Sequence, residues 1–275
     1  METKNSQTLR QKLKGYKAHP FSAIVAGMVL LAALITFCVL IFLVAFILVK
    51  GIRYLTPDLF ALKYTTENAS LMPALVNTLI ITALSLLIAV PIGVFAAIFL
   101  VEYANRGSRL VSLIRITTET LSGIPSIIYG LFGLLFFTTA LKWGFSLLSG
   151  SLTLVIMILP LVIRREASFG LGAGKLRTIF KVVLPSAVPG ILAGVILATG
   201  RIVGETAALI YTAGTVAQIP GNLLGSGRTL AVHMYSLASE GLYMNQAYAT
   251  AVVLLVIVLL INWISGRIAA KIAKH

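Results

Sequence analysis

Residues 21–49 read FSAIVAGMVLLAALITFCVLIFLVAFILV, a run that contains no charged side chain. A helix that crosses about 30 Å of hydrocarbon needs about 20 apolar residues, so this run is long enough to span a bilayer. It is too long for the core of a signal peptide and lacks a small-residue cleavage site, so we expect a retained membrane span. Cys38 is the single cysteine of the chain, which excludes an intrachain disulfide, and we expect it to be a small buried hydrophobic residue.

Apolar runs recur along the rest of the chain. Hydrophobic residues make up 59% of the 275 positions and charged residues only 11%, which is too few ionised groups for the surface of a soluble domain. Strand-like alternation is absent, and a backbone in lipid must satisfy its own hydrogen bonds, so the runs predict helices. The sequence therefore predicts an all-α membrane protein with six transmembrane helices, whose runs are 21–49, 73–101, 116–141, 151–163, 186–211 and 248–264.

Local signals refine these runs. Pro91 lies inside the second run, where we expect a kink, and Asn68 or Ser70 is suited to cap its start. The run 151–163 is short, and it spans only if the residues before it join the helix. Residues 229–239 place apolar side chains among small polar ones, which suits a helix lying at the membrane interface.

The basic residues indicate the orientation. The formal net charge is +14, but Lys and Arg lie between the apolar runs rather than on one soluble surface, so no nucleic-acid partner is predicted. With the N-terminus inside, the cytoplasmic segments hold sixteen Lys and Arg and the external segments five, while Arg201 lies within a span. Short cytoplasmic loops carry such an excess, so we expect both termini in the cytoplasm of a bacterium and the chain in its inner plasma membrane. Attraction to anionic lipid adds to the effect.

The predicted organisation has four parts. A basic cytoplasmic tail (1–20) is followed by the first span with an external connection (21–72). Five spans then form a permease-like core (73–265), which includes a cytoplasmic loop at about 164–185. A second cytoplasmic tail (266–275) ends the chain.

The cytoplasmic loop carries a specific pattern. It reads REASFGLGAGK over residues 165–175 and TIFKVVLP over residues 178–185. The order of acid, aromatic residue, glycines and Leu-Pro before the next span resembles the Glu-Ala-Ala ("EAA") loop of ABC-importer permeases. The resemblance implies a type I ABC importer permease fold, MetI-like, and a loop that couples to a cytoplasmic ATPase. The residues implied in this coupling are Arg165, Glu166, Ala167, Gly170, Gly172 and Ala173.

Two other stretches narrow the resemblance. Residues 200–209 read GRIVGETAAL and residues 117–131 read TTETLSGIPSIIYGL, and both are similar to the phosphate-transport permeases called PstA. This similarity covers most of the chain from about Asn77 onward. It implies a permease subunit of an ATP-driven phosphate importer that is not itself an enzyme and binds no cofactor, while a partner ATPase uses ATP and Mg. The implied partners are a second, PstC-like permease, a PstB-like ATPase dimer, an external PstS-like phosphate-binding protein and the lipid bilayer.

One feature departs from the family's pattern. In relatives a longer stretch separates the end of the fourth span from the Arg-Glu-Ala triplet, whereas here Arg164 is followed directly by Arg165. Either the loop is shortened or a segment is absent from this sequence. Docking of the ATPase is the function that this departure affects.

A charged side chain within a span needs a counter-charge, protein or water around it, because an Arg at mid-helix costs about 2.5 to 3.5 kcal/mol on insertion. Two interpretations of Arg201 stay open. It lines the translocation pathway and offers an anion its guanidinium, or it is structural, through an ion pair with Glu205 four residues on or a bridge to a partner subunit. For Glu119 we expect pairing with Arg201 or a role in gating. The predicted pathway residues are Arg201, Glu205, Thr206, Glu119 and Ser122.

The fifth run contains two Gly-x-x-x-Gly pairs, Gly190 with Gly194 and Gly200 with Gly204. Such pairs permit close approach between helix backbones. They predict a helix that is packed on several sides at the core of the pathway.

Several function classes are excluded or kept as rivals. The glycines of 170–175 lack the spacing of an ATP-binding loop, and the three histidines are scattered, so we predict no ATP site, metal site or catalytic triad. A secondary transporter would need paired broken repeats or coupling carboxylates, and a membrane scaffold would not need Arg201. A permease for another oxyanion, namely sulfate, molybdate or phosphonate, would keep the mechanism and change the cargo.

Overall fold

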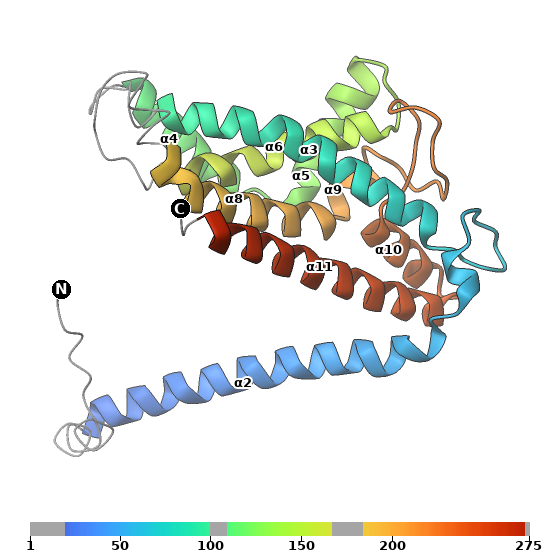
Figure 1. The fold of residues 1–275 in the computed structure, drawn as a ribbon, viewed down its shortest axis with the longest axis horizontal. Helices are drawn as coiled ribbons and strands as arrows, with labels where there is room; N and C mark the ends of the chain where they lie inside the picture. Colours follow the sequence, from blue (N-terminus) through green and yellow to red (C-terminus); the bar gives the residue numbers. More distant parts are fainter. Residues whose placement is uncertain (1–19, 100–108, 167–183, 273–275) are drawn as a thin grey trace. The chain divides into compact units, whose positions relative to one another are not determined.

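The computed structural model describes residues 20–99, 109–166 and 184–272, which form helices joined by loops (Figure 1). The chain divides into two compact units, residues 1–49 and 50–275. Each unit is considered by itself.

The first unit holds helix α2 (Pro20–Gly51) as far as Val49, and this helix extends the predicted first span by only a few residues. The helix is apolar on all sides, and its most hydrophobic window is 0% buried within the chain. The prediction of a buried Cys38 is therefore wrong: this side chain is exposed. A helix that is apolar all round is suited to lipid or to another protein surface rather than to water.

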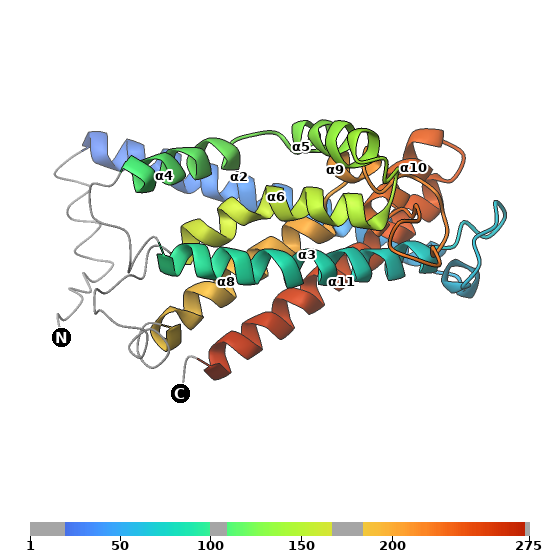
Figure 2. The same cartoon turned by 90° about the horizontal axis from the view of Figure 1, so that it is seen from above.

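The second unit packs its long helices side by side (Figures 1 and 2). Helix α6 lies along α3, and α8 contacts α3, α6 and α11, while α5 packs on α6 and α9. The elements are the 3-10 helices η1 (Ile52–Tyr54) and η2 (Pro57–Phe60), α3 (Met72–Ile98), α4 (Arg109–Ser122), α5 (Ser126–Gly133), the π-helix η4 (Leu134–Ala140), α6 (Leu147–Glu166), α8 (Leu184–Val203), α9 (Ala207–Ile210), α10 (Leu230–Glu240) and α11 (Met244–Ile272).

The main core lies where α3, α6, α8 and α9 meet. Its fully buried large side chains include Ile81, Leu154, Ile158, Ile202 and Leu209. Small polar side chains share this interior, for example Ser85, whose hydroxyl donates to the carbonyl of Ser151 at 3.2 Å. Such hydrogen bonds satisfy polar groups that lipid cannot, and they hold spanning helices together.

Three helices of the described chain, α2, α3 and α11, are long and apolar enough to cross a membrane by themselves. The predicted third run is not one straight helix: α4 and the pair α5–η4 meet at 103°, with the break at residues 123–125. Pro125 removes a backbone donor there, which explains the interruption. The apolar parts of α6 and α8 are shorter, at residues 147–163 and 192–203.

One local prediction is confirmed: helix α6 begins at Leu147, so the residues before Ser151 join the helix as the span length required. A helix, α10, is also present at the predicted 229–239 segment, while its place at the membrane interface stays a prediction. Helix α3 continues through Pro91 as one helix, and the kink expected there stays a prediction.

Of the two residues predicted to cap α3, only Ser70 bonds to the start of the helix. The Ser70 hydroxyl accepts the N–H of Met72 at 3.3 Å. The Asn68 carboxamide oxygen accepts the N–H of Thr65 at 2.8 Å and that of Ser70 at 3.0 Å, so it stabilises the preceding turn rather than the helix.

Candidate functional site

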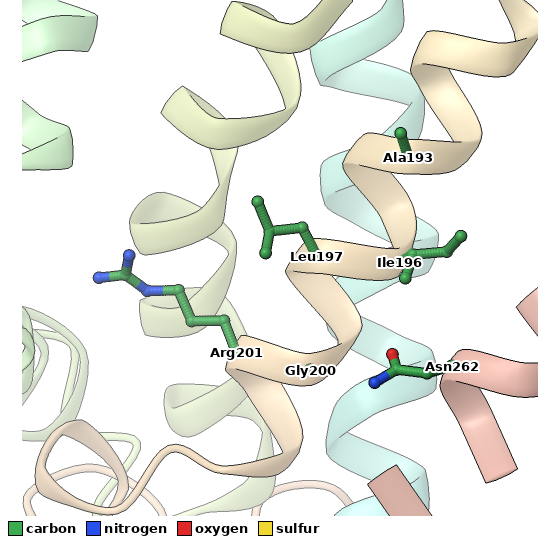
Figure 3. A pocket seen from close by; sticks show the side chains of 6 residues that line it. All are labelled: Ala193, Ile196, Leu197, Gly200, Arg201 and Asn262. Atoms are coloured by element: carbon green, nitrogen blue, oxygen red, sulfur yellow. The ribbon is translucent and has the colours of Figure 1, made fainter. Parts of the chain in front are cut away.

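Arg201 lies in the last turn of α8, half-buried, at the edge of a cavity of about 580 Å³. The residues of α8 that line this cavity recur at helical spacing, so they form one face of the helix. The lining residues are Ala193, Ile196, Leu197, Gly200 and Arg201 of α8 and Asn262 of α11 (Figure 3). The only charged side chain among them is that of Arg201, so the cavity carries a positive charge.

The structure does not show the ion pair between Arg201 and Glu205, which was one of the two open interpretations of Arg201. Helix α8 ends at Val203, so Glu205 does not continue the helical face on which Arg201 lies. The Glu205 side chain is buried, and its carboxylate accepts the N–H of Ala208 at 3.1 Å at the start of α9. Within the described residues, no ion pair joins the two side chains.

The other predicted pathway residues are dispersed. Thr206 precedes the first residue of α9 and makes no side-chain cap there. Glu119 is exposed on α4, and no ion pair joins it to Arg201 within the described residues. The alternative for Glu119, a role in gating, stays a prediction. Ser122 donates its hydroxyl to the Glu119 carbonyl at 2.8 Å, which closes the last turn of α4.

Arg201 is thus left without a carboxylate partner in the described part of the chain. Figure 3 shows its guanidinium extending from α8 in a direction away from Asn262. A cation in the last turn of a helix is favoured by the partial negative charge of the helix C-terminus, which accounts for part of its stability there.

The second predicted glycine pair, Gly200 in α8 and Gly204 just after the helix, has open space beside it. A Cβ added at Gly200 would meet no atom within 4 Å, and one at Gly204 would meet only the Gly200 carbonyl, at 3.5 Å. Gly190 and Gly194 are buried. Close approach at Gly200 is therefore not made by the described part of this chain, and packing of another helix there stays a prediction.

The predicted coupling loop is described only at its start. Arg165 and Glu166 form the last residues of α6. Ala167, Gly170, Gly172 and Ala173 lie outside the described residues.

Sequence reasoning missed a polar cluster at the other end of the second unit. Arg228 is 5% exposed, and its Nε and Nη2 have no hydrogen-bond partner. Its guanidinium carbon lies 4.8 Å from the centre of the Tyr64 ring. Burial and the charge of Arg228 lower the pKa of His233 to about 3, while the Ala69 backbone acts in the opposite direction. His233 is therefore neutral at ordinary pH.

Asn77 anchors the loop that carries Arg228. Its side-chain N–H₂ group donates to the carbonyls of Gln218 at 2.8 Å and Arg228 at 3.1 Å. The sequence feature that could have indicated this contact is an asparagine within an apolar run. Asn262 is a second such asparagine, in α11. The described residues contain no group of three or more His, Cys, Asp or Glu that could hold a metal ion.

Comparisons with known proteins agree with this architecture. Residues 89–274 match the family described as the binding-protein-dependent transport system inner membrane component. The chain is 32% identical over 284 residues to the probable ABC transporter permease protein YqgI of Bacillus subtilis, covering 90% of this chain and 96% of that protein. It is 30% identical over 269 residues to the phosphate transport system permease protein PstA of Haemophilus influenzae, covering 92% and 95%.

Two solved structures share the fold. A chain of a bacterial alginate ABC transporter, bound to an alginate-loaded periplasmic protein, superposes with a TM-score of 0.68 at 16% identity, over 94% of this chain and 98% of that one. A chain of the MetNI methionine ABC transporter superposes with a TM-score of 0.52 at 20% identity, over 74% and 94%. The predicted type I importer permease fold is thus confirmed.

The family places the chain in the bacterial inner membrane as a multi-pass protein of a binding-protein-dependent ABC importer, which also contains a binding protein and an ATPase. ATP hydrolysis belongs to the partner subunit. The chain therefore belongs to the binding-protein-dependent ABC importer permeases and forms a membrane-spanning subunit of such an importer.

Proposed function

We propose that this chain is a permease subunit of a phosphate importer and that Arg201 lines its translocation pathway. The observation that carries the proposal is a guanidinium on a membrane helix, at the edge of a cavity of about 580 Å³, without a carboxylate among the residues that line it. A cation at such a position needs water, protein or a counter-charge. A passing oxyanion supplies that charge, and guanidinium geometry suits it.

The names of the relatives support phosphate as the cargo. A PstA homolog of Mycoplasma pneumoniae is 37% identical over 182 residues, which covers 59% of this chain. A phosphate permease of the other type, PstC of Mesorhizobium japonicum, is 30% identical over 263 residues and covers 81%. The chain is similar to phosphate permeases of both types, PstA and PstC. This similarity favours phosphate as the cargo over sulfate, molybdate or phosphonate.

The proposed coupling runs from the cytoplasmic loop into α8. Closure of a PstB-like ATPase pair moves the loop that begins at Arg165 and Glu166, and the pathway switches between outward and inward access. A PstC-like permease forms the other half of the pathway, and a PstS-like protein delivers phosphate from outside. The guanidinium carbon of Arg267 lies 4.8 Å from the centre of the Trp263 ring, a pair suited to a membrane interface. The Lys and Arg residues that follow the last span support a cytoplasmic C-terminus.

Uptake of radiolabelled phosphate by the complete complex in liposomes tests the proposal. Arg201→Gln is expected to lower uptake at least tenfold while the complex still assembles, and Arg201→Lys is expected to retain part of the activity because the charge remains. The matched control is Arg53→Gln, an exposed arginine in η1 that is expected to transport normally. Normal uptake by Arg201→Gln would remove Arg201 from the pathway.

Cargo is tested on the same liposomes. We expect phosphate, and not sulfate or molybdate, to stimulate ATP hydrolysis when the binding protein is present. If sulfate alone stimulates ATP hydrolysis, the cargo is sulfate rather than phosphate. The assignment as an importer subunit would stand.

A further inference from the structure

Asn262 is a polar side chain on a part of α11 whose other side chains are largely apolar and exposed. Its neighbours Leu259, Leu260, Trp263 and Ile264 are exposed in this chain. The Asn262 side chain makes no hydrogen bond to any part of the chain that the structure describes. A carboxamide that faces hydrocarbon without a partner is costly, so this side chain needs water, a ligand or another protein group beside it.

The direction of the side chain favours the cavity. Figure 3 shows the Asn262 carboxamide pointing toward α8 at Gly200. A Cβ at Gly200 would meet no atom within 4 Å, so the space between the two helices is open at this level. Asn262 borders the same cavity as Arg201.

The polar side chains that line the cavity are those of Arg201 and Asn262, and the rest of the lining is apolar or glycine. The guanidinium only donates hydrogen bonds, whereas the carboxamide donates through its nitrogen and accepts through its oxygen. Hydrogen phosphate presents acceptor oxygens and also an O–H donor. Sulfate at neutral pH presents acceptors alone, so the carboxamide oxygen distinguishes the two anions.

We propose that Asn262 contacts the cargo and helps to select a protonated oxyanion: its Oδ1 accepts the O–H of hydrogen phosphate while its Nδ2 donates to a second oxygen. This inference rests on the proposed function, because it assumes that the Arg201 cavity is part of the phosphate pathway. Figure 3 shows the two side chains on different sides of Gly200, so the anion meets them in succession rather than in one cage.

Four variants test the contact in the complete complex. Asn262→Leu removes both donor and acceptor and is expected to lower the maximal rate of phosphate uptake about 5- to 10-fold, the range expected for one or two lost hydrogen bonds. The concentration for half-maximal uptake is expected to stay unchanged, because the external binding protein sets it. Asn262→Gln is expected to restore part of the rate. Asn245→Leu, at the exposed start of the same helix, is the matched control and is expected to transport normally.

The nearly isosteric variant Asn262→Asp distinguishes a role of Asn262 in cargo contact from a role in packing. A carboxylate keeps the volume but loses the donor and repels an anion, so uptake is expected to fall below that of Asn262→Leu. A role in packing alone predicts uptake close to that of the unmodified complex, and that result would overturn the proposal.

A chemical probe keeps the test valid for a variant that assembles poorly. Cys38 is the only cysteine of the chain, so Cys38→Ser leaves a background into which Asn262→Cys introduces a single thiol. We expect a membrane-impermeant thiol reagent to modify position 262 in at least one of the nucleotide-free and ATP-trapped complexes, and inorganic phosphate to slow the reaction. Leu260→Cys, on the other side of α11, is expected to react much more slowly. Absence of modification at position 262 in both complexes would overturn the proposal.

Failure of this inference differs from failure of the proposed function. If Arg201→Gln abolishes uptake while Asn262→Leu and Asn262→Asp transport normally, the role of Asn262 is refuted and the phosphate pathway stands. If the unmodified complex transports sulfate and not phosphate, both are refuted.

Discussion

The guanidinium carbon of Arg228 lies 4.8 Å from the centre of the Tyr64 ring, so a buried cation rests on an aromatic face. The same ring meets His233 edge-on, with centroids 6.2 Å apart and planes at 90°. Arg228 is 5% exposed and His233 is 0% exposed. Two segments that are far apart in the sequence, around residue 64 and at residues 228–233, are joined here. The ring helps to offset the cost of burying the charge.

Replacement of Tyr64 tests this contact. Tyr64→Leu is expected to destabilise the protein by about 1 to 2 kcal/mol, because Arg228 loses the aromatic face while remaining buried. Tyr64→Phe keeps the ring and is expected to remain close to the original stability. Thermal unfolding of the purified complex measures the difference, with the exposed Tyr235→Leu as control. Equal stability of the Leu and Phe variants at position 64 would contradict the cation–π interpretation.

The buried His233 is expected to make the free energy of unfolding depend on pH. Its pKa is about 3 in the folded protein, against 6.5 for an unperturbed histidine, so between these values the unfolded state binds a proton that the folded state does not. Stability is therefore expected to fall as the pH decreases from about 6.5 toward 3, by about 2 kcal/mol at pH 5.

The measurement for His233 is the unfolding temperature at pH 7.5 and at pH 5. His233→Gln removes the titrating group, so its stability is expected to change less between the two pH values. The readout is this difference in pH response rather than the absolute stability. A variant with the same pH response as the original protein would show that other groups cause it.

Gly133 tests the packing of α5 against its neighbours. A Cβ at this position would collide with Oγ1 of Thr153 and would lie 2.6 Å from Cγ2 of Thr212. Gly133→Ala is therefore expected to destabilise the protein by about 1 to 3 kcal/mol. Gly266→Ala is the matched control, because a Cβ there meets nothing within 4 Å. Similar unfolding temperatures for the two variants would refute the close contact.

Gly200 tests the cavity rather than the packing. A Cβ at Gly200 would meet no atom within 4 Å, and the residue borders the cavity, so Gly200→Leu is expected to leave the stability of the isolated subunit unchanged. The added side chain occupies space beside Arg201, and phosphate uptake is expected to fall at least tenfold if the cavity is the pathway. The comparison variant is Gly266→Leu, an open glycine outside the cavity lining. Normal uptake by Gly200→Leu would mean that cargo does not pass this face.

The spans were predictable because each depends on a local property of the chain. The length of the run 21–49 predicts α2, and the shortness of 151–163 predicts that the residues before it join α6. The break after Val203 was not predictable in the same way, since apolar residues continue on both sides of it up to Tyr211. The ion pair with Glu205, one of the two interpretations of Arg201 that the sequence left open, is absent for this reason.

The polar contacts depended on distances between segments, which hydropathy does not encode. Asn77 reaches the carbonyls of Gln218 and Arg228 only because α3 passes beside their loop. Asn262 borders the cavity only because α11 lies beside α8. In both cases the signal was an asparagine in an apolar run, and the sequence contained no indication of its neighbour.

The break after Val203 has a mechanical consequence. Helix α8 is an uninterrupted rod of 20 residues that starts at Leu184 and ends two residues after Arg201. At about 1.5 Å per residue the rod is about 30 Å long, so a tilt of about 10° about one end shifts the other by about 5 Å. Leu184 and Arg201 thus lie near opposite ends of one lever. A tilt of this size about the Leu184 end moves the guanidinium by more than the length of a hydrogen bond.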